Sequence, residues 1–383
     1  MKKTLLAILV LLVIGAGVYG LGRLVRQRAA QQAAEQFYLG ESFLEQQDDD
    51  SAREAFLTLI NRWPRSEYAE RALAYLGEIS ERAEQFETAL EYWRRILEQF
   101  PTTSRGTEVR YHIGYCLEKQ NRFEEAHDMY ERAPAGSAYW VLSQCGIGRM
   151  AEHMTTPDLL GARDIYRGAV EAAEPGSPEY KEAVGLLGAL NVRLLFSRAT
   201  TPESILYTVR SGDTISGLGA RFNVSKASII RANGLDPNVP LRVNRTIKIT
   251  PQEYSIVIDK SDFALRLFAD GQLFKEYVVG IGRPEYPTTA GKYVIENKMV
   301  NPTWYSPDGK VYEGGDPANE LGSRWMGLRP LEPDLPTDLG IHATIHPDTV
   351  GWASSRGCPR MLEADAEELF DIVPLRTPVL IQE

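Results

Sequence analysis

Cysteine and histidine are scarce in this sequence. The 383 residues include three cysteines and five histidines, with no Cys-x-x-Cys pair and no cluster of histidines. A disulfide framework and a Cys/His metal centre are therefore excluded, and no metal ion or cofactor is expected. Cys116 and Cys145 fall in segments of helical periodicity, where small buried apolar residues are the favoured interpretation and a disulfide is the alternative.

Basic tracts are also absent. Lys and Arg number 42 against 52 Asp and Glu, which gives a formal net charge of -10 at pH 7. Phosphate backbones are bound mainly through clustered Lys and Arg, so nucleic acid is excluded as a partner. The length exceeds what one hydrophobic core usually organises, and we expect about two to four domains.

The longest uncharged run covers residues 4–22, with two lysines before it and three arginines after it. At about 1.5 Å of rise per helical residue, this run is long enough for the hydrocarbon core of a bilayer. It is apolar on every face, which excludes a buried helix of a soluble domain. We expect residues 1–28 to form an uncleaved signal anchor, in preference to a removed signal peptide.

Between residues 29 and 200 the sequence repeats with a period of 37 residues. The repeated positions are Tyr38-Leu39-Gly40, Tyr75-Leu76-Gly77 and His112-Ile113-Gly114, with Trp63-Pro64 and Phe100-Pro101. Small residues at fixed points let paired helices approach closely, and the prolines end each second helix. The pattern resembles tetratricopeptide repeats, with a weaker fourth unit around residues 161–166. The resemblance implies a surface for a protein or peptide partner, with a spacer as the alternative.

Residues 204–251 have the order strand, helix, helix, strand, and carry Tyr207-Thr208-Val209 followed by Gly212-Asp213-Thr214-Ile215. This segment resembles a LysM module, which implies binding of glycans that contain N-acetylglucosamine. The positions implied are Gly212, Asp213, Thr214, Ile215, Asn233, Gly234 and Leu235. The alternative is that Gly-Asp-Thr serves only as a turn and helix cap.

Apolar and polar residues alternate in three segments after residue 253, and Asp270-Gly271 is typical of a hairpin turn. A helix over residues 363–370 and a strand over residues 378–381 follow. The pattern predicts a mainly β domain over residues 253–383, arranged as an antiparallel sandwich. The whole chain is thus predicted to be a multidomain α plus β protein.

Near the end of the chain, Ile341-His342-Ala343-Thr344 is followed by Ser355-Arg356-Gly357-Cys358-Pro359-Arg360-Met361. A cysteine acts as a nucleophile when a neighbour lowers its pKa or removes its proton, and imidazole suits that task near neutral pH. These motifs, with Asn301-Pro302-Thr303-Trp304-Tyr305 upstream, resemble the YkuD-type L,D-transpeptidase catalytic domain. The resemblance covers about the last third of the protein.

The resemblance implies a role for each matching residue. The catalytic candidates are Cys358, His342, Ser355 and Gly357, and the substrate-binding candidates are Arg360, Arg356, Ala343, Trp304 and Tyr305. Cys358 is the nucleophile and His342 its base, oriented by a neighbouring backbone carbonyl. The N–H groups of Gly357 and Cys358 suit an oxyanion, and Arg360 suits a stem-peptide carboxylate.

Three residues depart from the family pattern. Arg356 replaces a histidine of the Ser-His-Gly-Cys signature, and Ala343 stands where glycine is usual. Pro359 follows the nucleophile and removes one potential N–H donor. A guanidinium near the thiol still favours the thiolate, so these changes are compatible with activity.

The function implied is a peptidoglycan L,D-transpeptidase, which forms a cysteine acyl-enzyme from a tetrapeptide stem and transfers it to an amine. An L,D-carboxypeptidase or other peptidoglycan hydrolase with the same cysteine is one alternative, and a catalytically silent wall-binding scaffold is another. The expected partners are glycan strands and stem peptides, a protein or peptide on the repeats, and the membrane through the N-terminal helix. The expected location is the bacterial cell envelope.

Overall fold

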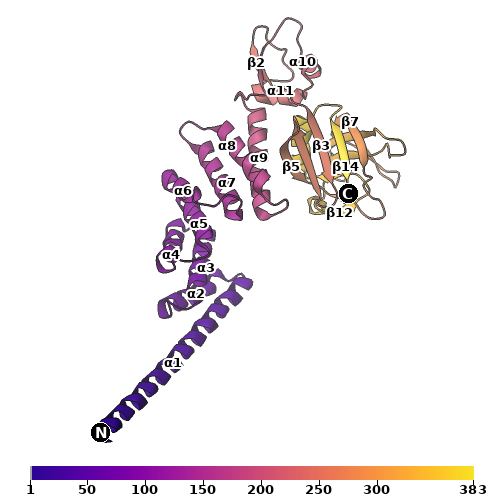
Figure 1. Ribbon diagram of the computed structural model, residues 1–383. Coiled ribbons are helices and arrows are strands. Elements are labelled where there is room, and N and C mark those ends of the chain that lie inside the picture. The colour runs from indigo at the N-terminus through magenta and orange to yellow at the C-terminus, as the bar shows by residue number, and fades with distance from the viewer. Residues whose placement is uncertain (1) are drawn as a thin grey trace. The chain divides into compact units, whose positions relative to one another are not determined.

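The computed structural model describes residues 2–383, with side chains described for residue 19 and from residue 21 onward. The chain divides into two compact units, Met1–Met150 and Ala151–Glu383 (Figure 1). Each unit is built around its own buried apolar residues.

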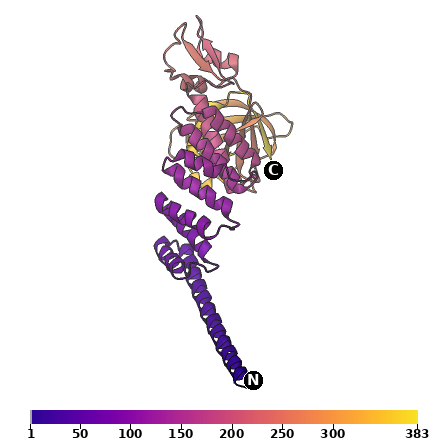
Figure 2. The same ribbon diagram turned by 60° about the vertical axis from the view of Figure 1, so that its left-hand side comes forward.

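The first unit is helical. Its helices are α1 (Lys2–Glu45), α2 (Asp49–Arg62), α3 (Ala69–Arg82), α4 (Phe86–Gln99), α5 (Gly106–Lys119), α6 (Phe123–Tyr130) and α7 (Ala138–His153), of which α7 continues into the second unit. From α1 to α6 each helix packs against the next one in the chain, and Figure 2 shows the long helix α1 leading into this array. Helices α3 and α5 begin 37 residues apart, so the predicted helical repeat is confirmed.

Close approach of paired helices explains the repeated glycine. A Cβ added to Gly40, Gly77 or Gly114 would lie 2.5, 2.5 or 2.7 Å from the ring of Phe56, Trp93 or Tyr130, respectively. Real Cβ atoms do not approach other atoms so closely, so each ring needs a glycine beneath it. The 37-residue repeat in the sequence therefore reflects a repeated packing of a glycine against an aromatic ring.

A buried and a half-buried carboxylate, Glu118 and Glu81, connect successive repeats. Glu118 accepts hydrogen bonds from the Tyr130 hydroxyl and from Arg149 Nε, both at 2.7 Å. One repeat earlier, Glu81 accepts from His112 Nδ1 at 3.0 Å. Charge-assisted bonds of this kind fix the angle between neighbouring helix pairs as well as their spacing.

The predicted membrane anchor depends on residues 4–22. Nearly all side chains of this segment lie outside the part of the chain that the structure describes. The backbone there belongs to α1, so the expected helix is present. In the part of the chain that the structure describes, no helix has both the length and the apolar character needed to cross a bilayer.

Two further helices, α8 (Leu159–Ala172) and α9 (Pro178–Phe196), open the second unit. The weak fourth repeat predicted around residues 161–166 lies on α8, which packs against α9. Helix α9 also packs on the β-rich domain, since Asn191 Nδ2 donates to the Phe274 carbonyl at 2.9 Å. Val192 and Leu195 belong to the same buried cluster as the sheet.

The LysM-like segment contains β1 (Ile205–Thr208), α10 (Ile215–Phe222), α11 (Lys226–Asn233) and β2 (Thr246–Ile249). Strands β1 and β2 pair antiparallel, with Tyr207 opposite Ile247. Thr214 caps α10, as predicted from the sequence, and Ser225 caps α11. Helix α11 contacts α9 and α12.

The C-terminal domain is rich in strands. They are β3 (Tyr254–Asp259), β4 (Ala264–Ala269), β5 (Gln272–Val278), β6 (Ile281–Gly282), β7 (Gly291–Val300), β8 (Trp304–Tyr305), β9 (Val311–Tyr312), β10 (Arg324–Pro330), β11 (Gly340–Ala343), β12 (Ala353–Ser355), β13 (Arg360–Met361) and β14 (Pro378–Gln382), with helix α12 (Glu363–Ile372) and a 3-10 turn at Pro347–Thr349.

Eight of these strands form one mixed sheet in the order β13-β11-β10-β7-β14-β3-β4-β5. Two small pairs, β12-β6 and β8-β9, lie beside it. The hairpin predicted at Asp270-Gly271 joins β4 and β5. The arrangement differs from the expected antiparallel sandwich, because β11 pairs parallel with β13 and β14 pairs parallel with β3. Parallel pairs join segments distant in sequence, which local alternation does not reveal.

Candidate active site

The edge of the eight-stranded sheet brings the two candidate catalytic segments together. Strands β11 and β13 are parallel neighbours, and His342 lies opposite Arg360. Cys358 comes two residues before Arg360, in the bend that leads into β13. The opposite face carries Ile341 and Met361, which belong to the apolar core.

One contact and partial burial define the environment of Cys358. Its Sγ lies 3.9 Å from the carbonyl oxygen of Asp338, just before β11. The side chain is half-buried and free of disulfide bonding. The nucleophile predicted from the sequence thus lies beside the strand that carries its predicted base.

His342 is buried, with 3% of its surface exposed. Its Nδ1 lies 2.5 Å from the carbonyl oxygen of Ala343. An oxygen of this kind only accepts, so Nδ1 carries the proton and Nε2 is left as the basic nitrogen. The contact expected between the histidine and the adjacent carbonyl is therefore present, and the methyl group of Ala343 does not prevent it.

Burial keeps both groups of the pair neutral at rest. It lowers the pKa of His342 to about 4, while the Ala343 carbonyl acts in the opposite direction. Burial also raises the pKa of the Cys358 thiol, which a hydrogen bond from Gly340 lowers in part. Near neutral pH the two groups are therefore a protonated thiol and a neutral imidazole.

The loop before Cys358 is held by hydrogen bonds from other segments. Thr288 is 1% exposed, and its hydroxyl donates to the Gly357 carbonyl at 2.6 Å and accepts from Gly282 N at 2.8 Å. Gly357 has a φ of +118°, which only glycine adopts readily. Sequence reasoning missed Thr288, because a threonine in a strand-rich segment carries no chemical signal of its own.

The geometry changes the interpretation of two predicted residues. Gly357 N–H donates to Ser355 Oγ at 3.2 Å, so it is already occupied. Ser355 therefore shapes the loop, and the N–H of Cys358 is the better candidate for an oxyanion donor, since Pro359 has none. Arg356 is exposed at the surface of the same loop.

The predicted aromatic residues lie on a separate hairpin. Trp304 stacks on Tyr312 across the β8-β9 pair, with ring centroids 5.2 Å apart, and Tyr305 is 75% exposed. The ring that contacts His342 is that of Trp325, at 5.9 Å between centroids. A Cβ on Gly340 would lie 2.4 Å from this indole, which therefore covers the strand beside the catalytic pair.

Two of the predicted glycan positions, Asp213 and Asn233, make hydrogen bonds within the LysM-like segment itself. Asp213 accepts from the Tyr207 hydroxyl at 2.9 Å and from Arg210 N at 2.7 Å. Asn233 is buried and donates to the Lys248 carbonyl at 2.7 Å, so its side chain is not available to a ligand. The remaining positions are placed as follows: Gly212, Thr214 and Gly234 are exposed, whereas Ile215 and Leu235 pack on the small core.

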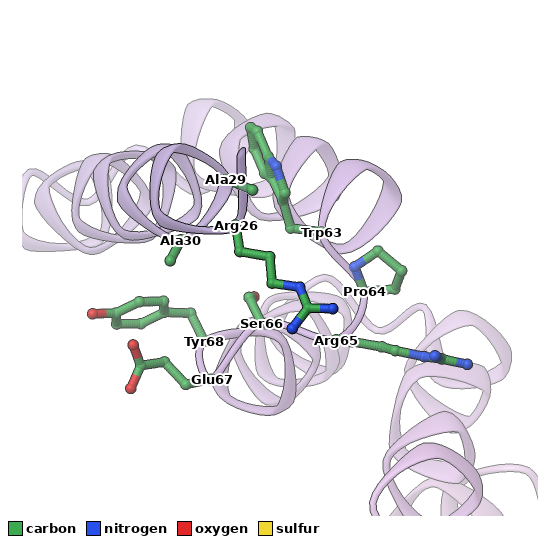
Figure 3. Close-up of a pocket in the computed structure, with 9 residues that line it drawn as sticks. All are labelled: Arg26, Ala29, Ala30, Trp63, Pro64, Arg65, Ser66, Glu67 and Tyr68. Atoms are coloured by element: carbon green, nitrogen blue, oxygen red, sulfur yellow. The ribbon is translucent and has the colours of Figure 1, made fainter. Parts of the chain in front are cut away.

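A cavity of about 600 Å³ lies in the first unit, away from the catalytic pair. It is lined by Arg26, Ala29, Ala30, Trp63, Pro64, Arg65, Ser66, Glu67 and Tyr68. Figure 3 shows the Arg26 side chain reaching from α1 toward the turn between α2 and α3. Among the described residues, no group of three or more His, Cys, Asp or Glu side chains is arranged to hold a metal ion.

Comparison with known families assigns each segment. The L,D-transpeptidase catalytic domain (YkuD) matches residues 253–381, and the LysM domain matches residues 207–250. Tetratricopeptide repeats match residues 36–66 and 71–139. The C-terminal domain is therefore an L,D-transpeptidase catalytic domain, preceded by a LysM domain and tetratricopeptide repeats.

Two bacterial relatives show the family of the C-terminal domain. The YkuD protein of Bacillus licheniformis, named as an L,D-transpeptidase, is 30% identical over 184 residues, which are 46% of this chain and 98% of the relative. The YqjB protein of Bacillus subtilis, named likewise, is 32% identical over 34% of this chain and 72% of its own. Among solved structures, L,D-transpeptidase 3 from Mycobacterium tuberculosis matches 37% of this chain and 66% of its own, at 19% identity and a TM-score of 0.29. The chain belongs to the YkuD family of L,D-transpeptidases.

Proposed function

We propose that this protein is a peptidoglycan L,D-transpeptidase that remodels the bacterial cell wall. The observation that carries the proposal is the hydrogen bond of His342 Nδ1 to the Ala343 carbonyl, on the strand beside Cys358. It leaves Nε2 as a base for the thiol, which is what a cysteine acyltransferase needs.

The reaction has two halves. Cys358 Sγ attacks the carbonyl carbon of the third residue of a tetrapeptide stem, and His342 takes the thiol proton. The C–N bond to the terminal D-alanine then breaks, the leaving amine receives that proton, and a thioester remains. An acceptor amine attacks the thioester, His342 removes its surplus proton, and Cys358 leaves as the thiol.

The other domains support a role at the cell wall. We assign glycan binding to the LysM domain, within residues 204–251, and protein or peptide binding to the repeats, within residues 29–200. Residues 1–28 are proposed to tether the chain to the membrane, and residues 253–383 to carry the catalysis. Together these assignments place the protein in the bacterial cell envelope.

Incubation of the purified protein with disaccharide-tetrapeptides tests the activity. Mass spectrometry of the products distinguishes cross-linked dimers, expected from transfer, from tripeptides, which indicate a hydrolase. Unchanged substrate would indicate a silent wall-binding scaffold. Cys358→Ala is expected to abolish every product, and products that persist would show that the nucleophile is a different residue.

A further inference from the structure

Arg360 is a buried cation beside the catalytic pair. It lies opposite His342 in the parallel register and two residues after Cys358, and it is 9% exposed. Reciprocal backbone hydrogen bonds with Gly280, both 2.8 Å, fix its main chain. Its position is therefore set by the sheet, and only the side chain has freedom to move.

The guanidinium has a specific anionic partner. Arg360 Nη2 lies 3.1 Å from Glu320 Oε2, whereas Arg360 Nε is buried and makes no hydrogen bond among the described atoms. A buried cation is stable only when it is paired, so Glu320 is important to the placement of this side chain. Glu320 takes up one N–H group of the guanidinium fork, so a carboxylate of a stem peptide would compete with Glu320 for this cation.

The main chain next to Glu320 is fixed by Asn319. The neighbouring Asn319 is 1% exposed, and its Nδ2 donates to the carbonyls of Pro302 at 2.8 Å and Glu313 at 3.2 Å. Its Oδ1 accepts from Leu321 N at 3.0 Å. Through these hydrogen bonds, Asn319 ties together the two ends of the segment that carries the β8-β9 hairpin.

Residues 319–322, at the end of this segment, pack against β11, the strand that carries His342. A Cβ added to Gly322 would lie 2.6 Å from the Cβ of Ala343, so the two backbones are in close contact there. Burial lowers the pKa of His342, and the Leu321 carbonyl is one of the groups that oppose this effect. Residues 319–322 thus contact β11 and the side chain of Arg360 at once.

We propose that Glu320 is a positioning residue for the transfer reaction, and that it acts by holding the Arg360 guanidinium beside Cys358 and His342. Arg360 then serves the nucleophile electrostatically and is not the receptor for a stem-peptide carboxylate. The inference rests on the proposed function for its kinetic consequence. Its structural part concerns the reactivity of Cys358 alone, which is measurable without any peptidoglycan substrate.

The charge relation gives the direction of the effect. Burial raises the pKa of the Cys358 thiol, and the Arg360 cation acts the opposite way. If the tether is removed, the guanidinium is free to turn toward solvent, and the thiolate loses a stabilising charge. The thiol should then react more slowly near neutral pH.

Alkylation of Cys358 by iodoacetamide, in a background where Cys116 and Cys145 are replaced by Ala, tests the proposal. Glu320→Ala is expected to lower the second-order rate about tenfold, as a rise of one pKa unit would. Glu320→Gln keeps an oxygen that accepts from Arg360, so it should restore the rate to within about threefold of the parent. Glu313→Ala is the matched control, since its side chain contacts Thr303 and not Arg360.

A double-mutant cycle shows whether Glu320 acts through Arg360. The cycle includes a double variant that should still fold, because it leaves no unpaired buried charge. Replacing both partners, as Glu320→Ala with Arg360→Met, removes the buried charge as well as its tether. The double variant should be no slower than Arg360→Met alone. Independent, multiplying effects would overturn the proposal, as would an unchanged rate in Glu320→Ala at a melting temperature equal to that of the parent.

Turnover of disaccharide-tetrapeptide separates the two roles of Arg360. We expect Glu320→Ala to lower kcat with little change in KM. A lower KM instead would show that Glu320 blocks a carboxylate receptor, which contradicts the proposal. If the parent protein gives no product at all, the proposed function fails, and the alkylation series still decides the role of Glu320.

Discussion

At the scale of single residues, burial controls the ionisation of the catalytic pair. It raises the pKa of Cys358 above its ordinary value near 9.0 and lowers that of His342 to about 4. A preformed thiolate–imidazolium pair would require a lowered pKa at Cys358 and a raised pKa at His342, which is the opposite of both shifts. We therefore expect Cys358 to behave as a slow thiol in the absence of substrate.

The pH dependence of alkylation tests this expectation. The rate of reaction with iodoacetamide should rise continuously as the pH increases from 6 to beyond 9, because the thiolate fraction follows a raised pKa. The measurement is the second-order rate at a series of pH values, with Cys116 and Cys145 replaced by Ala. A plateau below pH 8 would contradict the prediction and indicate a preformed ion pair.

His342 also links stability to pH. In the unfolded chain an imidazole titrates near 6.5, whereas burial lowers the folded value to about 4. The folded state therefore binds fewer protons in this window, and stability present above pH 6.5 is lost as the pH falls toward 4. The contribution is on the order of 3 kcal/mol.

Chemical unfolding of the wild type and of His342→Gln, at pH 7 and at pH 4.5, measures this contribution. The neutral glutamine has no titration, so the variant should lose less stability over this range than the wild type does. Equal losses in the two proteins would show that His342 is not the group responsible.

At the scale of elements, packing explains why the repeats were readable from the sequence. The 37-residue period marks positions where a glycine lies beneath an aromatic ring, as Gly77 does beneath Trp93. A local signal, Gly-Asp-Thr, also predicted the cap of α10 in the LysM domain. The ion pair of Arg360 with Glu320 gave no such signal, because its partners are 40 residues apart and the pairing depends on the parallel register of β11 and β13.

Substitution of Gly77 tests the packing argument. Gly77→Ala places a Cβ 2.5 Å from Trp93, so we expect the first unit to lose about 1–3 kcal/mol of stability. Gly168→Ala, on α8 of the second unit, is the control for adding a methyl group to a helical glycine, since Gly168 faces open space and alanine favours a helix by up to about 1 kcal/mol. Thermal unfolding followed by circular dichroism gives both values, and equal effects would contradict the close approach.

At the scale of the whole molecule, the second unit contains more than the catalytic and LysM domains. Helix α9 covers part of the sheet, with Val192 and Leu195 in its core. The Lys248 side chain of the LysM domain is buried and donates to the Leu194 carbonyl at 2.6 Å and the Ser197 carbonyl at 3.0 Å. The boundary expected near residue 200 would therefore cut through a shared core.

Two truncations follow from this arrangement. Residues 151–383 should fold as a unit and alkylate at Cys358 at the rate of the full chain, because they retain α9 and every contact of the catalytic pair. Residues 201–383 lack α9, which exposes the sheet and leaves the Lys248 ammonium without its carbonyl acceptors. We expect a melting temperature at least about 5 °C lower, measured by differential scanning fluorimetry. Equal melting of the two fragments would show that α9 adds nothing to the domain it covers, and that the catalytic part begins after the helical repeats.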